Sequence, residues 1–103
     1  MFQTNGATKW RIWNDGSDNT LQIRDEVNSA NVMTWEAGGD VGIGTAAPSR
    51  KLHVSGSGAT IAVKAEATDG NQSSLDLKNS EGEFRIINDG GSLYVYDQTD
   101  TAE

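Results

Sequence analysis

Short runs of alternating apolar and polar residues, each ended by Asn, Asp, Ser or Gly, occupy most of this chain. Such alternation is the period of a β-strand with one buried face. The clusters between the runs, such as Asn14-Asp15-Gly16 and Asn88-Asp89-Gly90, favour tight hairpin turns. We therefore predict an all-β protein. The expected strands are residues 9–14, 20–24, 31–35, 51–54, 60–65, 74–78, 83–88 and 92–97.

One stretch also suits a helix. Residues 59–67 (ATIAVKAEA) contain good helix formers, but Ile61 and Val63 fit a strand about equally well. The sequence alone therefore leaves open whether residues 59–78 are β or helical, and it does not give the strand order.

Two parts of the sequence resemble each other. Residues 10–16 (WRIWNDG) match residues 84–90 (FRIINDG), and after a contraction of two residues, 21–25 (LQIRD) match 93–97 (LYVYD). Each copy predicts an aromatic-led hairpin, and such repeats indicate modules stacked along an axis. The second copy ends early, so we expect a fragment of a longer repetitive protein. The expected parts are a first hairpin repeat (1–39), a junction (40–58), a connecting β segment (59–78) and a second, truncated hairpin repeat (79–103).

The composition suggests a core that is completed by more than one chain. The chain has 103 residues, of which 35% are hydrophobic, and a small chain buries a low fraction of its surface when it folds alone. Its apolar residues are nevertheless grouped in strand-like runs, unlike those of a disordered chain.

Charge and residue usage exclude several classes of function. Fifteen acidic against eight basic residues give a net charge of -7, which repels nucleic acid and anionic membranes. The absence of cysteine excludes disulfides and thiolate metal sites. No apolar run approaches the roughly 18 residues of a membrane-spanning helix, so we expect no membrane insertion.

Residues 42–47 (GIGTAA) fit the glycine pattern of a dinucleotide-binding loop. That mechanism needs a buried strand before the glycines and a helix after them, whose amides hold the pyrophosphate. Residues 36–40 (EAGGD) are no buried strand, and Pro48 followed by strand spacing leaves no room for a helix. We therefore interpret the stretch as a stiff, extended connector.

Within this connector, apolar residues alternate with glycines. Val41 and Ile43 present one apolar face, while Gly42 and Gly44 carry no side chain. Because a glycine in a strand often marks the close approach of another backbone, we expect Gly42 and Gly44 to allow neighbouring chains to approach closely.

Residues 39–56 (GDVGIGTAAPSRKLHVSG) resemble the recurrent GNVGIGTTxPxxKLxVxG element of bacteriophage tail-fibre and related trimeric fibre proteins. The resemblance implies an elongated, intertwined, parallel homotrimer of the β-prism or triple-β-helix type, built from short hairpin repeats. A self-cleaving chaperone domain often follows this element, but it has no counterpart here, so its autoproteolysis is not carried over. The matching residues are Val41, Gly42, Ile43, Gly44, Thr45, Pro48, Lys51, Leu52, Val54 and Gly56.

The resemblance implies a structural shaft or spacer module of a virion tail fibre that takes part in host attachment and has itself as its partner. The alternatives are a fibre tip that binds a host-surface glycan, and a fragment of a bacterial extracellular fibre. Burial between chains is expected to form the trimer core. Its expected members are Trp10, Ile12, Leu21, Ile23, Val41, Ile43, Leu52, Val54, Phe84, Ile86, Leu93 and Val95.

Two side chains are weighed as ligand contacts. Trp13 lies on the strand face opposite Trp10 and is a candidate glycan contact, but the second repeat has Ile87 there, which favours packing. His53, the single histidine, would meet its symmetry mates near a trimer axis and hold an ion there. A hydrogen-bonded strand histidine is the alternative, and the sequence leaves this open.

Catalysis has little support in the residues. The lone histidine has no evident Ser or Asp partners, cysteine is absent, and sequence spacing places no carboxylate pair at a catalytic separation. We expect no enzyme activity, no catalytic residues, no metal ligands and no cofactor.

Overall fold

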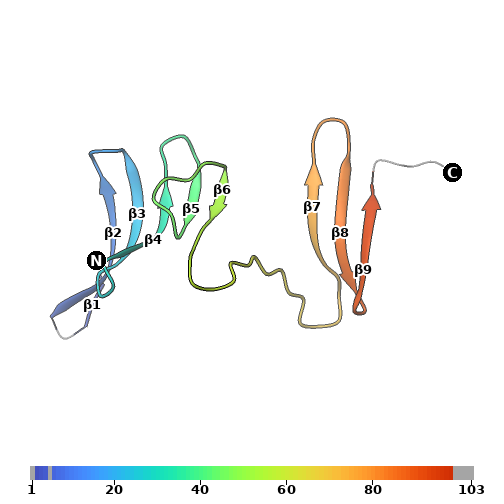
Figure 1. Cartoon of the computed structure of the whole chain (residues 1–103), viewed down its shortest axis with the longest axis horizontal. Helices are drawn as coiled ribbons and strands as arrows, with labels where there is room; N and C mark the ends of the chain where they lie inside the picture. Colours follow the sequence, from blue (N-terminus) through green and yellow to red (C-terminus); the bar gives the residue numbers. More distant parts are fainter. Residues whose placement is uncertain (1, 5, 99–103) are drawn as a thin grey trace. The chain divides into compact units, whose positions relative to one another are not determined.

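The computed structural model describes residues 2–4 and 6–98, with no statement on the side chains of residues 2–4. These residues form β-strands and no helix, which confirms the all-β prediction (Figure 1). The chain divides into two compact units, unit 1 ending at Ile61 and unit 2 beginning at Ala62. The strands are β1 (Phe2–Thr4), β2 (Ala7–Asp15), β3 (Thr20–Asp25), β4 (Ala30–Trp35), β5 (Val41–Ile43), β6 (Leu52–Val54), β7 (Ser73–Lys78), β8 (Glu83–Asp89) and β9 (Ser92–Asp97).

Unit 1 is a six-stranded sheet with the order β1-β2-β3-β4-β5-β6. Neighbouring strands are antiparallel from β1 to β5, and β5 and β6 are parallel. The expected junction therefore continues the sheet of the first hairpin repeat, because β5 pairs with β4 and β6 is added beyond it.

Unit 2 is a three-stranded antiparallel meander with the order β7-β8-β9. Its β8-β9 hairpin corresponds to the β2-β3 hairpin of unit 1. The register pairs Ile12 with Ile23 in unit 1 and Ile86 with Val95 in unit 2. The contraction by two residues falls in the turn, which has four residues (16–19) in the first hairpin and two (90–91) in the second.

One expected strand is absent from the structure, and one expected segment lies outside the residues that it describes. Residues 60–65 were expected to form a strand, but residues 55–72 contain neither strand nor helix. The alternation in that segment is present, but a strand also requires a hydrogen-bonding neighbour, and the segment has none among the described residues. Residues 99–103, the end of the expected second repeat, lie outside the described residues.

Aspartate side chains cap the turns between strands. Asp15 Oδ1 accepts hydrogen bonds from Ser17 N at 3.0 Å and Ser17 Oγ at 2.6 Å. Asp25 Oδ1 accepts from Val27 N at 2.9 Å, and its Oδ2 accepts from Asn28 Nδ2 at 2.6 Å. These donors stabilise the ionised carboxylates and therefore lower the pKa of both aspartates. For Asp25 the largest contribution comes from the side chain of Asn28.

The depressed pKa of Asp25 predicts a pH-dependent contribution to stability. Because the folded-state pKa lies below the unfolded value, the contribution is present above about pH 4 and is lost as the pH falls through the folded pKa. Asp25→Asn keeps an acceptor in the turn but cannot ionise. We expect wild type to be more stable than Asp25→Asn at pH 7 and the two to converge near pH 2, measured by thermal unfolding. A difference that stays constant over this range would contradict the assignment.

Candidate subunit interface

One face of the sheet in unit 1 is apolar across five neighbouring strands, β2 to β6. The register places five side chains in one row across these strands and four more in the next row, and Trp10 in β2 is the tenth. Each of the ten side chains is exposed or half-buried. This face, called the unit 1 apolar face, consists of Trp10, Ile12, Leu21, Ile23, Met33, Trp35, Val41, Ile43, Leu52 and Val54.

The opposite face of the same sheet is the covered one. Thr34 has no exposed surface, and Thr20 and Gln22 are each 3% exposed. Soluble proteins ordinarily bury apolar side chains and expose polar ones. In a single chain, unit 1 has the reverse arrangement, because its own side chains and loops cover the polar face.

A continuous network of side chains crosses this polar face. Trp13 Nε1 donates to Gln22 Oε1 at 3.1 Å, and Gln22 Nε2 donates to Thr20 Oγ1 at 2.8 Å. Thr20 Oγ1 donates to Asp18 Oδ1 at 2.7 Å. At the other end, the Arg11 guanidinium lies 5.7 Å from the centre of the Trp13 ring. The buried polar groups of Thr20 and Gln22 are thus hydrogen-bonded, as burial requires.

Charged side chains extend this network. Arg11 Nε lies 3.1 Å from Glu26 Oε1, and Arg24 Nε lies 3.6 Å from the same oxygen. Arg24 Nη1 also donates to Asn31 Oδ1 at 3.1 Å. The two arginines therefore share one carboxylate, and the polar face is closed at this end by an ion cluster.

Trp13 is placed as the sequence predicted, on the face opposite Trp10 and Ile12. Its indole N–H is engaged by Gln22, and Arg11 lies over its ring. These contacts assign Trp13 a packing role in the polar network. Its contact with a glycan stays a prediction.

Unit 2 also has one uncovered apolar face. The register aligns Leu75, Ile86 and Val95 across the three strands and Leu77 with Phe84 beside them. With Leu93, these form the unit 2 apolar face, and all six side chains are exposed. Among the described residues of the whole chain, Ile87 is the one buried hydrophobic side chain, and it lies on the other face.

The other face of unit 2 carries a bidentate ion pair between Arg85 and Asp76. Arg85 Nε and Nη2 each donate to a carboxylate oxygen of Asp76 at 2.9 Å. Hydrogen bonding by Arg85 holds the pKa of Asp76 below its ordinary value, and Asp76 raises the pKa of Arg85. In both units, therefore, the charged contacts lie opposite the apolar face.

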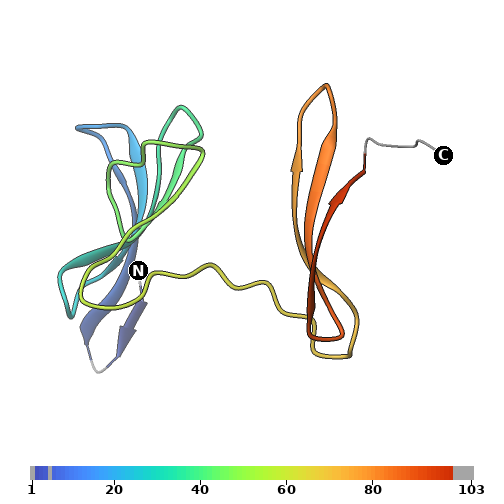
Figure 2. The same ribbon diagram turned by 45° about the vertical axis from the view of Figure 1, so that its right-hand side comes forward.

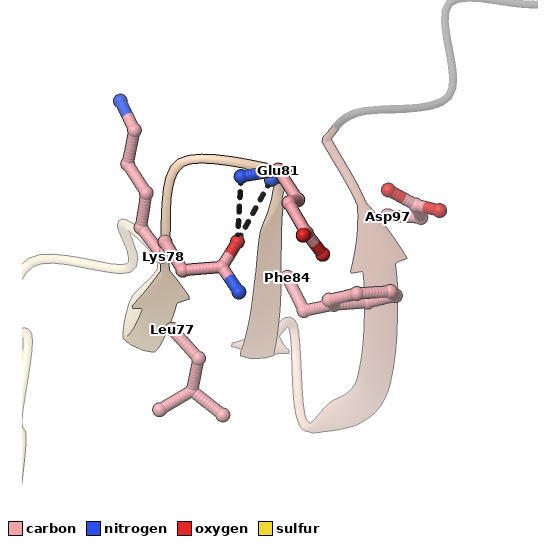
Figure 3. A pocket seen from close by; sticks show the side chains of 7 residues that line it. Leu77, Lys78, Glu81, Phe84 and Asp97 are labelled. Carbon is pink, nitrogen blue, oxygen red and sulfur yellow. Dashed lines mark hydrogen bonds between the residues drawn. The ribbon is translucent and has the colours of Figure 1, made fainter.

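A shallow hollow of about 460 Å³ lies at the β7-β8 turn of unit 2 (Figure 3). Leu77 and Phe84 line its apolar part, while Lys78, Glu81 and Asp97 supply charge. The turn is held by Asn79 Oδ1, which accepts from Glu81 N at 2.9 Å and Gly82 N at 3.0 Å. The hollow is thus the end of the unit 2 apolar face. In the part of the chain that the structure describes, no three His, Asp or Glu side chains are grouped to hold a metal ion.

The two junction glycines lie where the backbone of the same chain approaches. A Cβ atom at Gly42 would meet the carbonyl oxygen of Thr45, and one at Gly44 would meet the carbonyl oxygen of Ser55. Gly44 also has a φ of +77°, which favours glycine. The loop after β5 therefore folds back over the polar face. At both glycines the backbone of the same chain approaches closely. Approach between chains at these glycines stays a prediction.

Two further junction residues have contacts within the chain. Lys51 Nζ lies 2.7 Å from Asp40 Oδ1 and donates to the Gly38 carbonyl at 2.9 Å, which joins the starts of β5 and β6. His53 Nδ1 accepts from Ser49 N at 3.2 Å. The register places His53 beside Gly42, on the face opposite Leu52 and Val54. An ion at His53 would therefore lie away from the apolar face, and its binding stays a prediction.

The structure brings the expected core residues together on two faces. Eight of the twelve lie on the unit 1 apolar face and the remaining four on the unit 2 apolar face. Sequence reasoning missed Met33 and Trp35 in β4 and Leu75 and Leu77 in β7. Alternation in the stretches 31–35 and 74–78 was the available signal, but only the register shows that these side chains share a face with the others.

The chain matches no protein-family model, and no curated protein matches it at a significant level. Among the described residues there is no helix with the length and hydropathy that a membrane crossing requires.

The contact at Gly44 predicts a sharp sensitivity to substitution. Gly44→Ala adds a Cβ that combines strain from a positive φ with a backbone clash, and we expect a loss of about 2–4 kcal/mol in the free energy of unfolding. Gly58→Ala is the matched control, because Gly58 has a φ of +80° and no atom within 4 Å of its Cβ position. Denaturant unfolding of both variants measures the difference, and equal losses would contradict the contact.

Proposed function

We propose that the chain is a structural shaft or spacer module of a parallel homotrimeric fibre of the phage tail-fibre type, which takes part in host attachment. The observation that carries the proposal is the pair of uncovered apolar faces, on which all twelve expected core residues lie. On this proposal, each face is buried against the same face of two other copies.

In a single chain, the described residues leave both apolar faces uncovered. A sheet with one apolar face is stable when another layer covers that face. Each Val, Leu or Ile side chain that is fully buried contributes about 1.5–3 kcal/mol. The unit 2 apolar face alone offers Leu75, Leu77, Ile86, Leu93 and Val95, with Phe84 in addition. Burial of these side chains between copies supplies a core that neither unit has by itself.

The polar faces suit the outside of such a fibre. They carry the ion pairs Arg11–Glu26 and Arg85–Asp76, and the chain has a net charge of -7. Acidic surfaces keep long assemblies soluble. The fibre would belong to a virion, or to a bacterial cell surface if a bacterial fibre uses the same element.

A mechanical role fits these residues better than catalysis or glycan binding. The hollow at the β7-β8 turn is shallow and is continuous with the unit 2 apolar face. Trp13, the candidate glycan contact, already uses its N–H and lies against Arg11. The proposed module therefore acts as a spacer, with host recognition by another part of the fibre.

Two valines provide a matched test of the proposed interface. Val95 is 67% exposed and lies on the unit 2 apolar face, whereas Val27 is 63% exposed and lies in the β3-β4 turn. We expect Val95→Asp to convert the chain to monomers at micromolar concentration, because a buried unpaired carboxylate opposes assembly. Val27→Asp adds the same charge and is expected to remain trimeric.

Sedimentation equilibrium gives the mass of the wild type and of both variants. A wild-type chain that is a folded monomer would overturn the proposal, and so would a Val95→Asp variant that assembles as well as Val27→Asp.

A further inference from the structure

The segment between the two sheets is extended and lacks a strand partner. Figure 2 shows it as a plain ribbon with no arrow, and among the described residues no backbone–backbone hydrogen bond involves residues 57–72. Lys64 Nζ lies 2.8 Å from Glu66 Oε1, so these side chains point to one side, as residues two apart do in an extended chain. Ile61 and Val63 are 46% and 77% exposed.

We infer that residues 61–66 become a β-strand on assembly by adding in parallel to the outer edge of β7 in another copy of the chain. This inference rests on the proposed homotrimer and deepens it, because it names the backbone contact that joins one copy to the next. In a ring of three copies, each gives one such strand and receives one.

The edge of β7 matches the segment residue by residue. β7 is hydrogen-bonded to β8 alone among the described strands, so its outer edge is open. With Val63 beside Leu75, Ala65 lies beside Leu77, and the unit 2 apolar face becomes wider. On the other side of the sheet, the same register sets Lys64 beside Asp76. It also sets Glu66 beside Lys78. Oppositely charged cross-strand neighbours of this kind stabilise a register.

The alternative edges match less well. β1 and β6 have three residues each and cannot receive a strand of six. β9 has six residues, but its polar side presents Tyr94 and Tyr96, which carry no charge to complement Lys64 and Glu66. An antiparallel register on β7 that keeps Lys64 beside Asp76 places Glu66 beside Ser74 and loses the second charge pair.

The length of the connection requires that the receiving strand belongs to another copy. To pair with its own β7 in this parallel register, the chain must return about 17 Å along the strand direction. The seven Cα–Cα steps from Glu66 to Ser73 span at most about 25 Å when fully extended. This is too short for that return with two reversals of direction, since a crossover between parallel strands ordinarily takes a dozen or more residues. Asp69 Oδ1 also accepts from Asn71 N at 3.2 Å, so a turn already shortens this connection.

The contacts that the segment makes in one chain are loose. Val63 and Ala65 border an open hollow of about 300 Å³ together with Leu75, Ile86 and Leu93. Their apolar sides therefore face apolar neighbours without being packed against them, as expected of a segment that is completed by another copy.

Engineered disulfides test the register, since the chain contains no cysteine. The full chain carrying Ala62→Cys and Ser74→Cys places two thiols on directly opposite residues, within the Cα separation that a disulfide accepts. After oxidation with oxidised glutathione, we expect covalent dimers and trimers on a non-reducing gel. The pair Ala62→Cys with Ser92→Cys is the matched control, because it reports addition to β9 and is expected to remain uncrosslinked.

The charge register is tested in the same background. Glu66→Lys is expected to lower the yield of covalent oligomer by roughly two- to five-fold, and Lys78→Glu in the same chain is expected to restore it. A chain that sediments as a trimer but forms only intrachain disulfides, or crosslinks through Ser92→Cys instead, would overturn the inference while the proposed function stands. A monomeric wild-type chain would overturn both.

Discussion

The structure depends on an imbalance between the two faces of each sheet. In unit 1 the chain closes over the face that carries Thr20, Gln22 and Thr34, and it leaves ten apolar side chains on the other face without a cover. A single layer of this kind buries too little apolar surface to offset the loss of chain entropy on folding. The polar network is therefore a scaffold that holds the strands in register, and on the proposed trimer the free energy of burial would come from contacts between copies. Trp13 is central to this scaffold because its ring and its N–H join Arg11 to Gln22.

The same imbalance occurs in both units although their sheets share no strand. Ile12 and Ile23 occupy in unit 1 the places that Ile86 and Val95 occupy in unit 2, while the Trp13–Gln22 pair is replaced by Ile87 and Tyr94. One face is thus apolar in both units, whereas the opposite face carries different residues in each unit. A repeat that keeps one face constant is suited to stacking, because each module offers the same surface to the copies around it.

Local pattern was sufficient for seven strands, β2–β4 and β6–β9, and for the faces of their side chains, because alternation with period two is a property of neighbouring residues. It did not predict β1 or β5, which have three residues each. It was insufficient where pairing decides the outcome. Met33 and Trp35 join the apolar face only through the β3-β4 and β4-β5 registers. Residues 60–65 have the alternation of a strand, but no described strand pairs with them. Gly42 and Gly44 are expected to allow close approach between chains; in the structure the nearby backbones, at Thr45 and Ser55, come from the same chain, and approach between chains stays a prediction.

Open strand edges make such a chain prone to unselective pairing, and the charges on β7 bear on this hazard. An edge that carries Asp76 and Lys78 on one side disfavours a second hydrophobic strand, because pairing would desolvate both charges even though Arg85 and Glu83 lie beside them. A strand that presents Lys64 and Glu66 in the matching order would lower that penalty. On the proposed trimer, the same two charges would exclude wrong partners and select the right register. Selectivity would then come from the rejected alternatives as much as from the favoured contact.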